Sequence, residues 1–307
     1  MLFIPFLPEG HMPLDSQTTT LWIQPTGGAL GADVHGIDLS RDLDRPTYDM
    51  LADAWAKHFV LRFSGQKLDD DALMRFSRNW GELDRTPVGT AGQKVNGVAA
   101  NAVDWIAVIS NVKVEGKPIG GLGAYESVWH TDMSYNPLPP RASLLYALEC
   151  PSSGGDTGFC NMELAYESLP ADLKKAIQGK TCTHDSSRNS AGELRRGAKE
   201  TTDPRETPGA HHPLVRKHPV TGRSALFLGR RVGAYIQGLP VEESETLLNA
   251  LWAHASQQQF AWYQRWRVGD LMMWDNRNVM HRRDSFDDTA RRLMHRTQIV
   301  GEPVLAG

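Results

Sequence analysis

Regular patterning of hydrophobic and polar side chains begins with a short apolar run at 21–25, which predicts a strand. Residues 32–39 alternate between apolar and polar and predict a second strand, because successive side chains of a strand point to opposite faces. Apolar residues recur at helical spacing across 47–58 and predict a helix. A strand is expected over 59–63, and a helix over 69–79, where aspartates in the first turn suit the positive end of the helix dipole.

The second half of the chain is rich in predicted strands. Residues 143–148 are nearly all apolar, which is typical of a strand buried on both faces. The other elements expected from periodicity are strands at 107–111, 260–266, 271–274 and 293–299 and helices at 162–169, 171–178 and 241–255. Such a pattern, without the glycine-rich fingerprint of a nucleotide fold, favours two packed β-sheets over a parallel doubly wound sheet. We therefore predict a mainly β fold with α-helical additions.

The domain organisation follows from where the pattern breaks. Residues 1–20 lack the basic start and the small-residue cleavage site of a signal peptide, so we expect a flexible N-terminal arm. Residues 21–307 are expected to form a single domain. Within them, 185–212 is polar, rich in structure breakers and carries Arg188, Arg195 and Arg196. A segment of this length is either disordered or functional, and we interpret it as a lid inserted in the domain.

Composition narrows the class of protein without naming its chemistry. The 307 residues carry 33 basic and 36 acidic side chains, a net charge of −3, which argues against a protein held to nucleic acid or a membrane by bulk charge. No apolar run approaches the length of roughly 20 residues that spans a bilayer. The three cysteines are not arranged as CxxC, and we interpret them as reduced thiols of a cytoplasmic protein.

The candidate chemistry starts from a single His-x-Asp sequence, His130 and Asp132. In a strand, side chains two residues apart point to the same face, so the imidazole and the carboxylate could reach a common point. The pair alone is weak evidence, because a chain with 11 histidines contains such a pair by chance. His281 would complete a two-histidine, one-carboxylate face that leaves three positions of an octahedral metal open, as in non-haem Fe(II) oxygenases. Arg292, eleven residues later, would offer a planar fork to a carboxylate.

Several motifs in order resemble the TauD/TfdA family of Fe(II)- and 2-oxoglutarate-dependent dioxygenases. They are Trp129-His130-Thr131-Asp132, Gly154-Gly155-Asp156-Thr157, Trp274-Asp275-Asn276-Arg277 with His281, and Arg291-Arg292-Leu293-Met294-His295-Arg296. The resemblance extends over roughly residues 21–300. It implies a double-stranded β-helix, the jelly-roll or cupin-like core of that family. It also implies a homo-oligomer, either a dimer or a tetramer.

The resemblance also implies roles for individual residues. His130, Asp132 and His281 would ligate Fe(II). Arg292 and the hydroxyl of Thr157 would hold the distal carboxylate of the co-substrate 2-oxoglutarate. Arg296 matches the position that binds the anionic group of the substrate in several members. Because a carboxylate fills the third ligand position, the expected reaction is hydroxylation with O2, not halogenation, with release of succinate and CO2.

Alternatives remain at this stage. The same triad could hold Zn2+ in a metal-dependent hydrolase, or the chain could be a non-catalytic relative that binds anions or nucleic acid through its C-terminal arginines. His295 should face away from Arg296 and be structural, and Asp275 and Asn276 should brace the turn before His281. His211 and His212 are interpreted as solvated loop residues. The sequence does not choose among a sulfonate, an aryloxyalkanoate, a sulfate ester and a natural-product intermediate as substrate.

Overall fold

The fold of the protein is taken from a computed structural model, which describes residues 20–85, 94–95, 98–99, 104–124, 127–190, 192–195 and 197–307. Of the predicted N-terminal arm, only Thr20 is among these residues. Arg196 of the predicted lid lies outside them. The helices are α1 (Arg45–His58), α2 (Asp70–Arg78), α3 (Met162–Glu167), α4 (Ala171–Ile177) and α5 (Val241–Ala255), with short 3-10 turns at Pro204–Glu206 and Gln258–Phe260. The strands are β1 (Trp22–Pro25), β2 (Ala32–His35), β3 (Val60–Phe63), β4 (Lys94–Val95), β5 (Val98–Ala99), β6 (Ala107–Ser110), β7 (Lys113–Val114), β8 (Lys117–Pro118), β9 (Gly121–Leu122), β10 (Ser127–His130), β11 (Ala142–Glu149), β12 (Thr157–Asn161), β13 (Thr181–Asp185), β14 (Gly209–Pro213), β15 (Val215–Lys217), β16 (Ser224–Leu226), β17 (Tyr235–Ile236), β18 (Ala261–Gln264), β19 (Leu271–Asp275), β20 (Val279–Arg283) and β21 (Leu293–Ile299).

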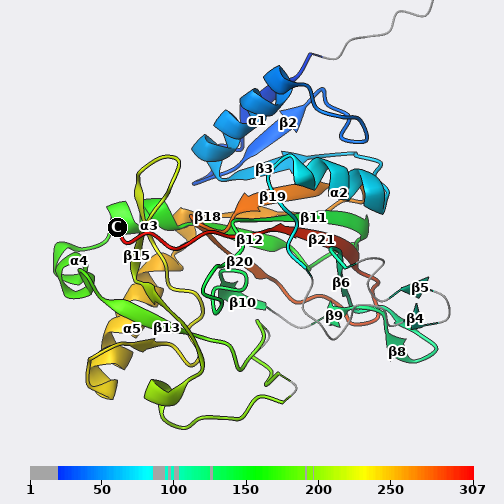
Figure 1. The fold of residues 1–307 in the computed structure, drawn as a ribbon. Helices are drawn as coiled ribbons and strands as arrows, with labels where there is room; N and C mark the ends of the chain where they lie inside the picture. The colour runs from blue at the N-terminus through cyan, green and yellow to red at the C-terminus, as the bar shows by residue number, and fades with distance from the viewer. Residues whose placement is uncertain are drawn as a thin grey trace, which may run out of the picture.

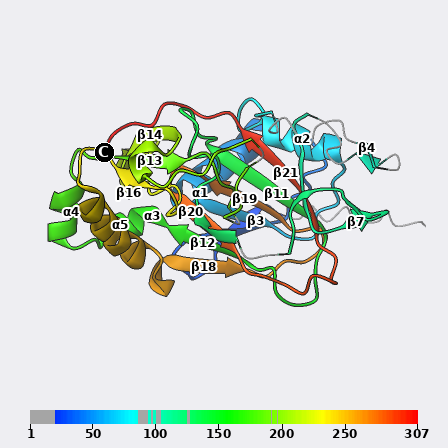
Figure 2. The ribbon, with the colours of Figure 1, turned by 90° about the horizontal axis from the view of Figure 1, so that it is seen from below.

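Two sheets form the centre of the molecule (Figures 1 and 2). The larger, within the described residues, has eight strands in the order β1-β2-β3-β19-β11-β21-β6-β9, and the smaller has four in the order β10-β20-β12-β18. The strands from β9 to β12, and those from β18 to β21, alternate between the two sheets in chain order. The mainly β architecture with helical additions is therefore confirmed.

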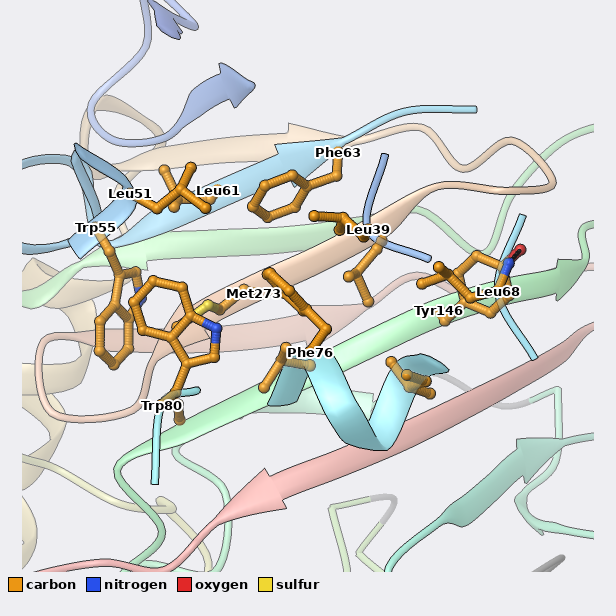
Figure 3. Close-up of a cluster of buried hydrophobic side chains, with 14 of the residues drawn as sticks. Leu39, Leu51, Trp55, Leu61, Phe63, Leu68, Phe76, Trp80, Tyr146 and Met273 are labelled. Atoms are coloured by element: carbon orange, nitrogen blue, oxygen red, sulfur yellow. Dashed lines mark hydrogen bonds between the residues drawn. The ribbon is translucent and has the colours of Figure 1, made fainter. Parts of the chain in front are cut away.

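The outer face of the large sheet is covered by the two N-terminal helices. Leu51 and Trp55 of α1 and Phe76 of α2 belong to one buried cluster with Phe63 of β3 and Tyr146 of β11 (Figure 3). This packing removes the apolar stripe of each helix from water, which is the main stabilising contribution of such elements. It also fixes the sheet that carries half of the candidate site.

The opposite face of the large sheet packs on the small sheet. Leu145 alternates with Leu144 and Tyr146 along β11, and joins a second cluster with Trp274 of β19 and Phe159 of β12. A third cluster fills the space between α3, α5 and the sheet β14-β13-β17, on the side of the molecule that also carries α4. The predicted burial on both faces is confirmed for 143–147, since every residue from Ala142 to Ala147 is buried, whereas Leu148 is partly exposed.

The predicted helices are observed with bounds shifted by a few residues at most. Helix α1 starts two residues before the predicted 47, because Asp44 caps it by accepting a hydrogen bond from the Thr47 amide. It ends at Phe59, whose backbone is left-handed with φ of 64°. The second predicted strand was too long, since β2 stops at His35 before Gly36, which takes a φ of +73° that other residues rarely adopt.

The predicted lid is partly regular structure. Its first residue belongs to β13 and its last four to β14, and the two strands pair with Thr183 opposite His211. The backbone amide of Ser186 also donates to the Pro208 carbonyl at 2.8 Å. The part of the segment outside strands β13 and β14 is therefore shorter than predicted, runs from Ser186 to Pro208 and includes the 3-10 turn Pro204–Glu206.

The helices of the described residues are all too short or too polar to cross a membrane.

Candidate metal and anion site

His130, Asp132 and His281 are brought together by the pairing of β10 with β20. His130 lies directly opposite His281 in the register, and the two ring centroids are 4.2 Å apart. The Nε2 atoms of His130 and His281 lie 3.6 and 3.8 Å from Oδ1 of Asp132. One ligand atom of each residue lies within 4.8 Å of the others, and all three residues are buried. This donor set suits a divalent transition metal with open coordination positions.

The strand argument for His130 and Asp132 was wrong in its local geometry. Strand β10 ends at His130, and Asp132 lies in the turn that follows. The two side chains nevertheless converge, with His130 at the end of the strand and Asp132 in the turn, where the Thr131 amide donates to the Gly229 carbonyl at 3.0 Å.

The neighbours of the two histidines orient them toward this point. Nδ1 of His130 lies 2.7 Å from the Val128 carbonyl, which can only accept, so Nδ1 carries the hydrogen and Nε2 presents its lone pair. The His281 ring is held between Trp274, at 4.8 Å between centroids, and Phe159, at 6.4 Å. Both rings are thus fixed before any ligand binds.

The protonation states also suit metal binding. Burial raises the pKa of Asp132, but the charges of Arg296, His281 and His130 outweigh burial and hold that pKa well below its ordinary value. Burial, followed by the neighbouring His130, lowers the pKa of His281 to about 3. An ionised carboxylate and a neutral imidazole are the forms that bind metals.

A cationic region lies beside the triad in the same cavity. Arg292 is 1% exposed, and its Nε and Nη1 atoms have no hydrogen-bond partner in the described part of the chain. Burial, followed by the charge of Arg283, lowers the pKa of Arg292 to about 9, so it remains a cation at neutral pH. A buried, unpaired guanidinium is costly unless an anion compensates it, and its planar fork matches a carboxylate.

Thr157 is placed to assist that anion. Its Oγ1 accepts a hydrogen bond from Nε1 of Trp266 at 2.9 Å, which leaves the hydroxyl hydrogen free to point elsewhere. The guanidinium of Arg292 lies 5.9 Å from the same Trp266 ring. The cavity that joins these groups to the triad is lined by Ile109, Ser127, His130, Asp132, Leu145, Thr157, Trp274, His281, Arg283, Arg292 and Arg296.

Arg296 lies at the metal end of this cavity. Its Nη1 atom is 3.2 Å from both carboxylate oxygens of Asp132. His295, the preceding residue, points to the other face of β21, where its Nδ1 lies 2.6 Å from Asp70 of α2. The predicted structural position of His295 is therefore confirmed.

The expectations for Asp275, Asn276 and His212 have different outcomes. Asp275 braces the turn before His281 as predicted, since its Oδ1 accepts from the Arg277 amide at 2.9 Å. Asn276 instead donates to Ser143, which donates to Asp132. His212 is not a solvated loop residue: it is 4% exposed, and its Nε2 lies 2.9 Å from the Asn136 carbonyl. Because β14 is a strand, His211 points the opposite way and is exposed.

Sequence reasoning missed the polar residues that surround the triad. Ser143 and Gln298 both donate to Oδ2 of Asp132, at 2.8 and 3.1 Å. A signal was present, since each is a polar residue in a predicted buried strand, and a buried polar side chain requires a partner. Arg283 and Trp266 were also missed, and nothing in their local sequence separates them from ordinary strand residues.

Comparisons with known proteins agree with this geometry. The family model described as taurine catabolism dioxygenase TauD, TfdA family, matches residues 22–298. An alpha-ketoglutarate-dependent 2,4-dichlorophenoxyacetate dioxygenase of Burkholderia sp. (strain RASC) is 39% identical over 251 residues, 79% of this chain and 82% of the relative. An alpha-ketoglutarate-dependent sulfate ester dioxygenase of Pseudomonas putida is 31% identical and covers 91% of this chain, with 89% of the relative covered. The crystal structure of AAD-2 in complex with Mn(II) and N-oxalylglycine superposes with a TM-score of 0.76 at 31% identity, covering 94% of this chain and 100% of that one.

Proposed function

Because the chain belongs to the TauD/TfdA family of dioxygenases, we propose that it is an Fe(II)- and 2-oxoglutarate-dependent dioxygenase that hydroxylates a small anionic organic molecule. The balanced reaction consumes the substrate, O2 and 2-oxoglutarate and yields the hydroxylated product, succinate and CO2: one oxygen atom enters the new hydroxyl and the other enters succinate. The observation that carries the proposal is the meeting of His130, Asp132 and His281 with the unpaired guanidinium of Arg292 in one cavity.

The roles of the residues follow from that meeting. His130, Asp132 and His281 hold Fe(II), and Arg292 with the Thr157 hydroxyl binds the distal carboxylate of 2-oxoglutarate. Fe(II), when bound, supplies the redox chemistry that couples O2 to decarboxylation of the 2-oxo acid and oxidation of the substrate. The protein orients the reactants and excludes water, since Asp132, His281 and Arg292 are each less than a tenth exposed.

The charge of the cavity favours anionic reactants. Its lining includes three arginines, Arg283, Arg292 and Arg296. Asp132 is the one acidic side chain among the described lining residues. We assign Arg296 to the anionic group of the substrate, because it lies beside the metal ligand Asp132 and lines the same cavity as Arg292. A carboxylate, sulfonate or sulfate would each match a guanidinium fork. A hydrolase would leave the buried, unpaired Arg292 without a purpose.

We also infer that the core is a double-stranded β-helix within a single domain over 21–307. In its support, β6, β11, β19 and β21 lie in the large sheet, and β10, β12, β18 and β20 lie in the small one. In such a fold the metal lies between the two sheets, and here the triad comes from β10, the turn after it and β20, facing strand β21 across the cavity.

The test is anaerobic addition of Fe(II) and 2-oxoglutarate to the metal-free protein. We expect a weak visible charge-transfer band, followed in air by succinate release that a substrate accelerates. Screening sulfonates, aryloxyalkanoates and alkyl sulfates for that acceleration identifies the substrate class. The His130→Ala variant should show neither the band nor substrate-dependent succinate, and a wild-type protein that binds neither Fe(II) nor 2-oxoglutarate would refute the proposal.

A further inference from the structure

The two oxygens of the Asp132 carboxylate have different surroundings. Oδ1 faces Nε2 of both His130 and His281. Oδ2 accepts hydrogen bonds from Oγ of Ser143 at 2.8 Å and from Nε2 of Gln298 at 3.1 Å. Arg296 reaches both oxygens equally and does not distinguish them. The difference therefore comes from Ser143 and Gln298.

The direction of the Ser143 hydroxyl is determined by its neighbours. Its oxygen accepts hydrogen bonds from Nδ2 of Asn276 at 3.0 Å and from Nε2 of Gln298 at 3.1 Å. An amide nitrogen of a side chain cannot accept, so neither neighbour can receive the hydroxyl hydrogen. A hydroxyl has one hydrogen and two lone pairs, and both lone pairs are occupied here. The hydrogen is left with Oδ2 of Asp132.

The orientation of Asn276 is fixed in turn by Trp274. Nε1 of Trp274 donates to Oδ1 of Asn276 at 2.9 Å, and an indole N–H can only donate. The Asn276 amide therefore cannot flip without losing this bond and turning its oxygen toward Ser143. The result is a chain of hydrogen bonds with one fixed direction, from Trp274 through Asn276 and Ser143 to Asp132.

The strand register builds this chain. Ser143 of β11 lies directly opposite Trp274 of β19 on one side and opposite Gln298 of β21 on the other. Ser143 is fully buried, and Asn276 and Trp274 are each 1% exposed, so water does not compete for these bonds. Trp274 also contacts the ring of His281, which links a second metal ligand to the same group.

We propose that Ser143 is a positioning residue that restricts Asp132 to metal binding through Oδ1 alone. A carboxylate held in this way occupies a single coordination position and leaves the others for the 2-oxo acid and O2. The inference rests on the proposed function, because it assumes that the triad holds a metal. Removing a hydrogen-bond partner of a metal ligand typically weakens metal binding about 10- to 100-fold.

The test measures metal binding separately from turnover. We expect Ser143→Ala to weaken Mn(II) binding to the full-length protein about 10- to 100-fold by calorimetry. The visible spectrum of the Co(II)-loaded variant should also change in shape and intensity, because a carboxylate that is free to turn alters the coordination geometry. Ser77→Ala is the matched control: Ser77 is also fully buried and bonds to Thr297, next to Gln298, but does not contact the triad. Its Mn(II) affinity should equal that of the wild type.

A second variant covers the case in which Ser143→Ala does not fold. Ser143→Cys keeps a weak S–H donor at the same position, and its Mn(II) affinity should lie between those of the wild type and the alanine variant. If the folded alanine or cysteine variant binds Mn(II) as tightly as the wild type with an unchanged Co(II) spectrum, the role of Ser143 is refuted. If the wild type itself binds no metal, the proposed function fails instead, so the two failures are distinguishable.

Discussion

Two arginines near strand β21 differ in their surroundings. Arg292 directly precedes β21 and Arg296 lies within it, and both side chains line the cavity. Arg292 lies next to Trp266 and is unpaired, whereas Arg296 lies against the carboxylate of Asp132. This short segment can therefore present two cations to two different anions.

Variants of Arg292 and Arg296 should therefore change the KM of different reactants. Arg292→Met should raise KM for 2-oxoglutarate about 100-fold or more, because loss of a buried, charge-assisted pair typically costs 3–5 kcal/mol. Arg296→Gln should instead raise KM for the organic substrate and leave KM for 2-oxoglutarate within about threefold, since Arg292 and Thr157, which we assign to the distal carboxylate, are untouched. Steady-state succinate assays with each reactant varied in turn measure both constants. Equal effects of both variants on both constants would contradict the assignment.

At the scale of elements, the segment from Ser186 to Pro208 is attached to the turn that carries Asp132. Nη1 of Arg195 donates to the Tyr135 hydroxyl at 2.7 Å, and its guanidinium lies 4.2 Å from the ring centroid. Nη1 of Arg230 donates to the Arg188 carbonyl at 2.6 Å. The Val128 amide of β10 also donates to the Ser190 carbonyl at 3.1 Å, so described parts of the segment contact β10 and the turn after it.

Loss of the Arg195 contact should free this segment. We expect Arg195→Ala to be cut faster within 186–208 by limited proteolysis with an enzyme that does not cleave at arginine, because local opening governs cleavage. The control is Arg205→Ala, since Arg205 lies in the same segment but pairs only with the nearby Asp203 among the described contacts. Substrate should slow the cutting of the wild type, and cutting that is unchanged by both Arg195→Ala and substrate would refute the lid.

The small sheet is the element that sequence patterning recovered least. Strands β10, β12 and β20 were not predicted, although the large-sheet strands β11, β19 and β21 were found within about one residue at each end. These strands were missed because some of their buried side chains are polar. Residues of β12 are all buried, yet Thr157 and Asn161 among them are polar because they face the cavity and a backbone carbonyl. Such strands show neither alternation nor a continuous apolar run.

For the whole molecule, the free energy of unfolding should depend on pH through buried titratable side chains and not only through the net charge of the surface. Burial lowers the pKa of His184 well below its ordinary value, and the neighbouring His212 adds to this. Burial opposes ionisation of Asp275, but Arg277 and His218 outweigh it and hold the Asp275 pKa below its ordinary range. In both cases the unfolded chain binds more protons than the folded one as the pH falls.

The sign is therefore the same for these groups in two separate windows. The free energy of unfolding of the metal-free protein should fall below about pH 6.5 through His184 and His281, by up to about 1.4 kcal/mol per pH unit for each, and further below about pH 3.8 through Asp275. Urea unfolding of the metal-free protein between about pH 5 and about pH 7 tests the first window. His184→Asn should flatten the slope relative to the wild type, while the exposed His211→Asn should leave it unchanged. A wild-type slope retained in His184→Asn would show that other groups cause it.

Residue types and their order along the chain were enough to predict the candidate ligands. The His-x-Asp sequence was weak evidence alone, and the resemblance of several motifs to the TauD/TfdA family made His130, Asp132, His281 and Arg292 candidates for binding a metal and a carboxylate. The apolar run at 143–148 predicted the central strand directly, because burial on both faces is a local property of the sequence.

How the candidate ligands are held depends on the pairing of strands that lie far apart in the sequence. Asp132, Ser143, Asn276 and Gln298 come from four separate segments and meet because β11 pairs with β19 and β21 in one register. A shift of one residue would turn Ser143 to the face covered by α1 and α2, and the local pattern around Ser143 does not specify its partner strands. The register between strands therefore determines which side chains donate hydrogen bonds to Oδ2 of Asp132, and no single strand does so alone.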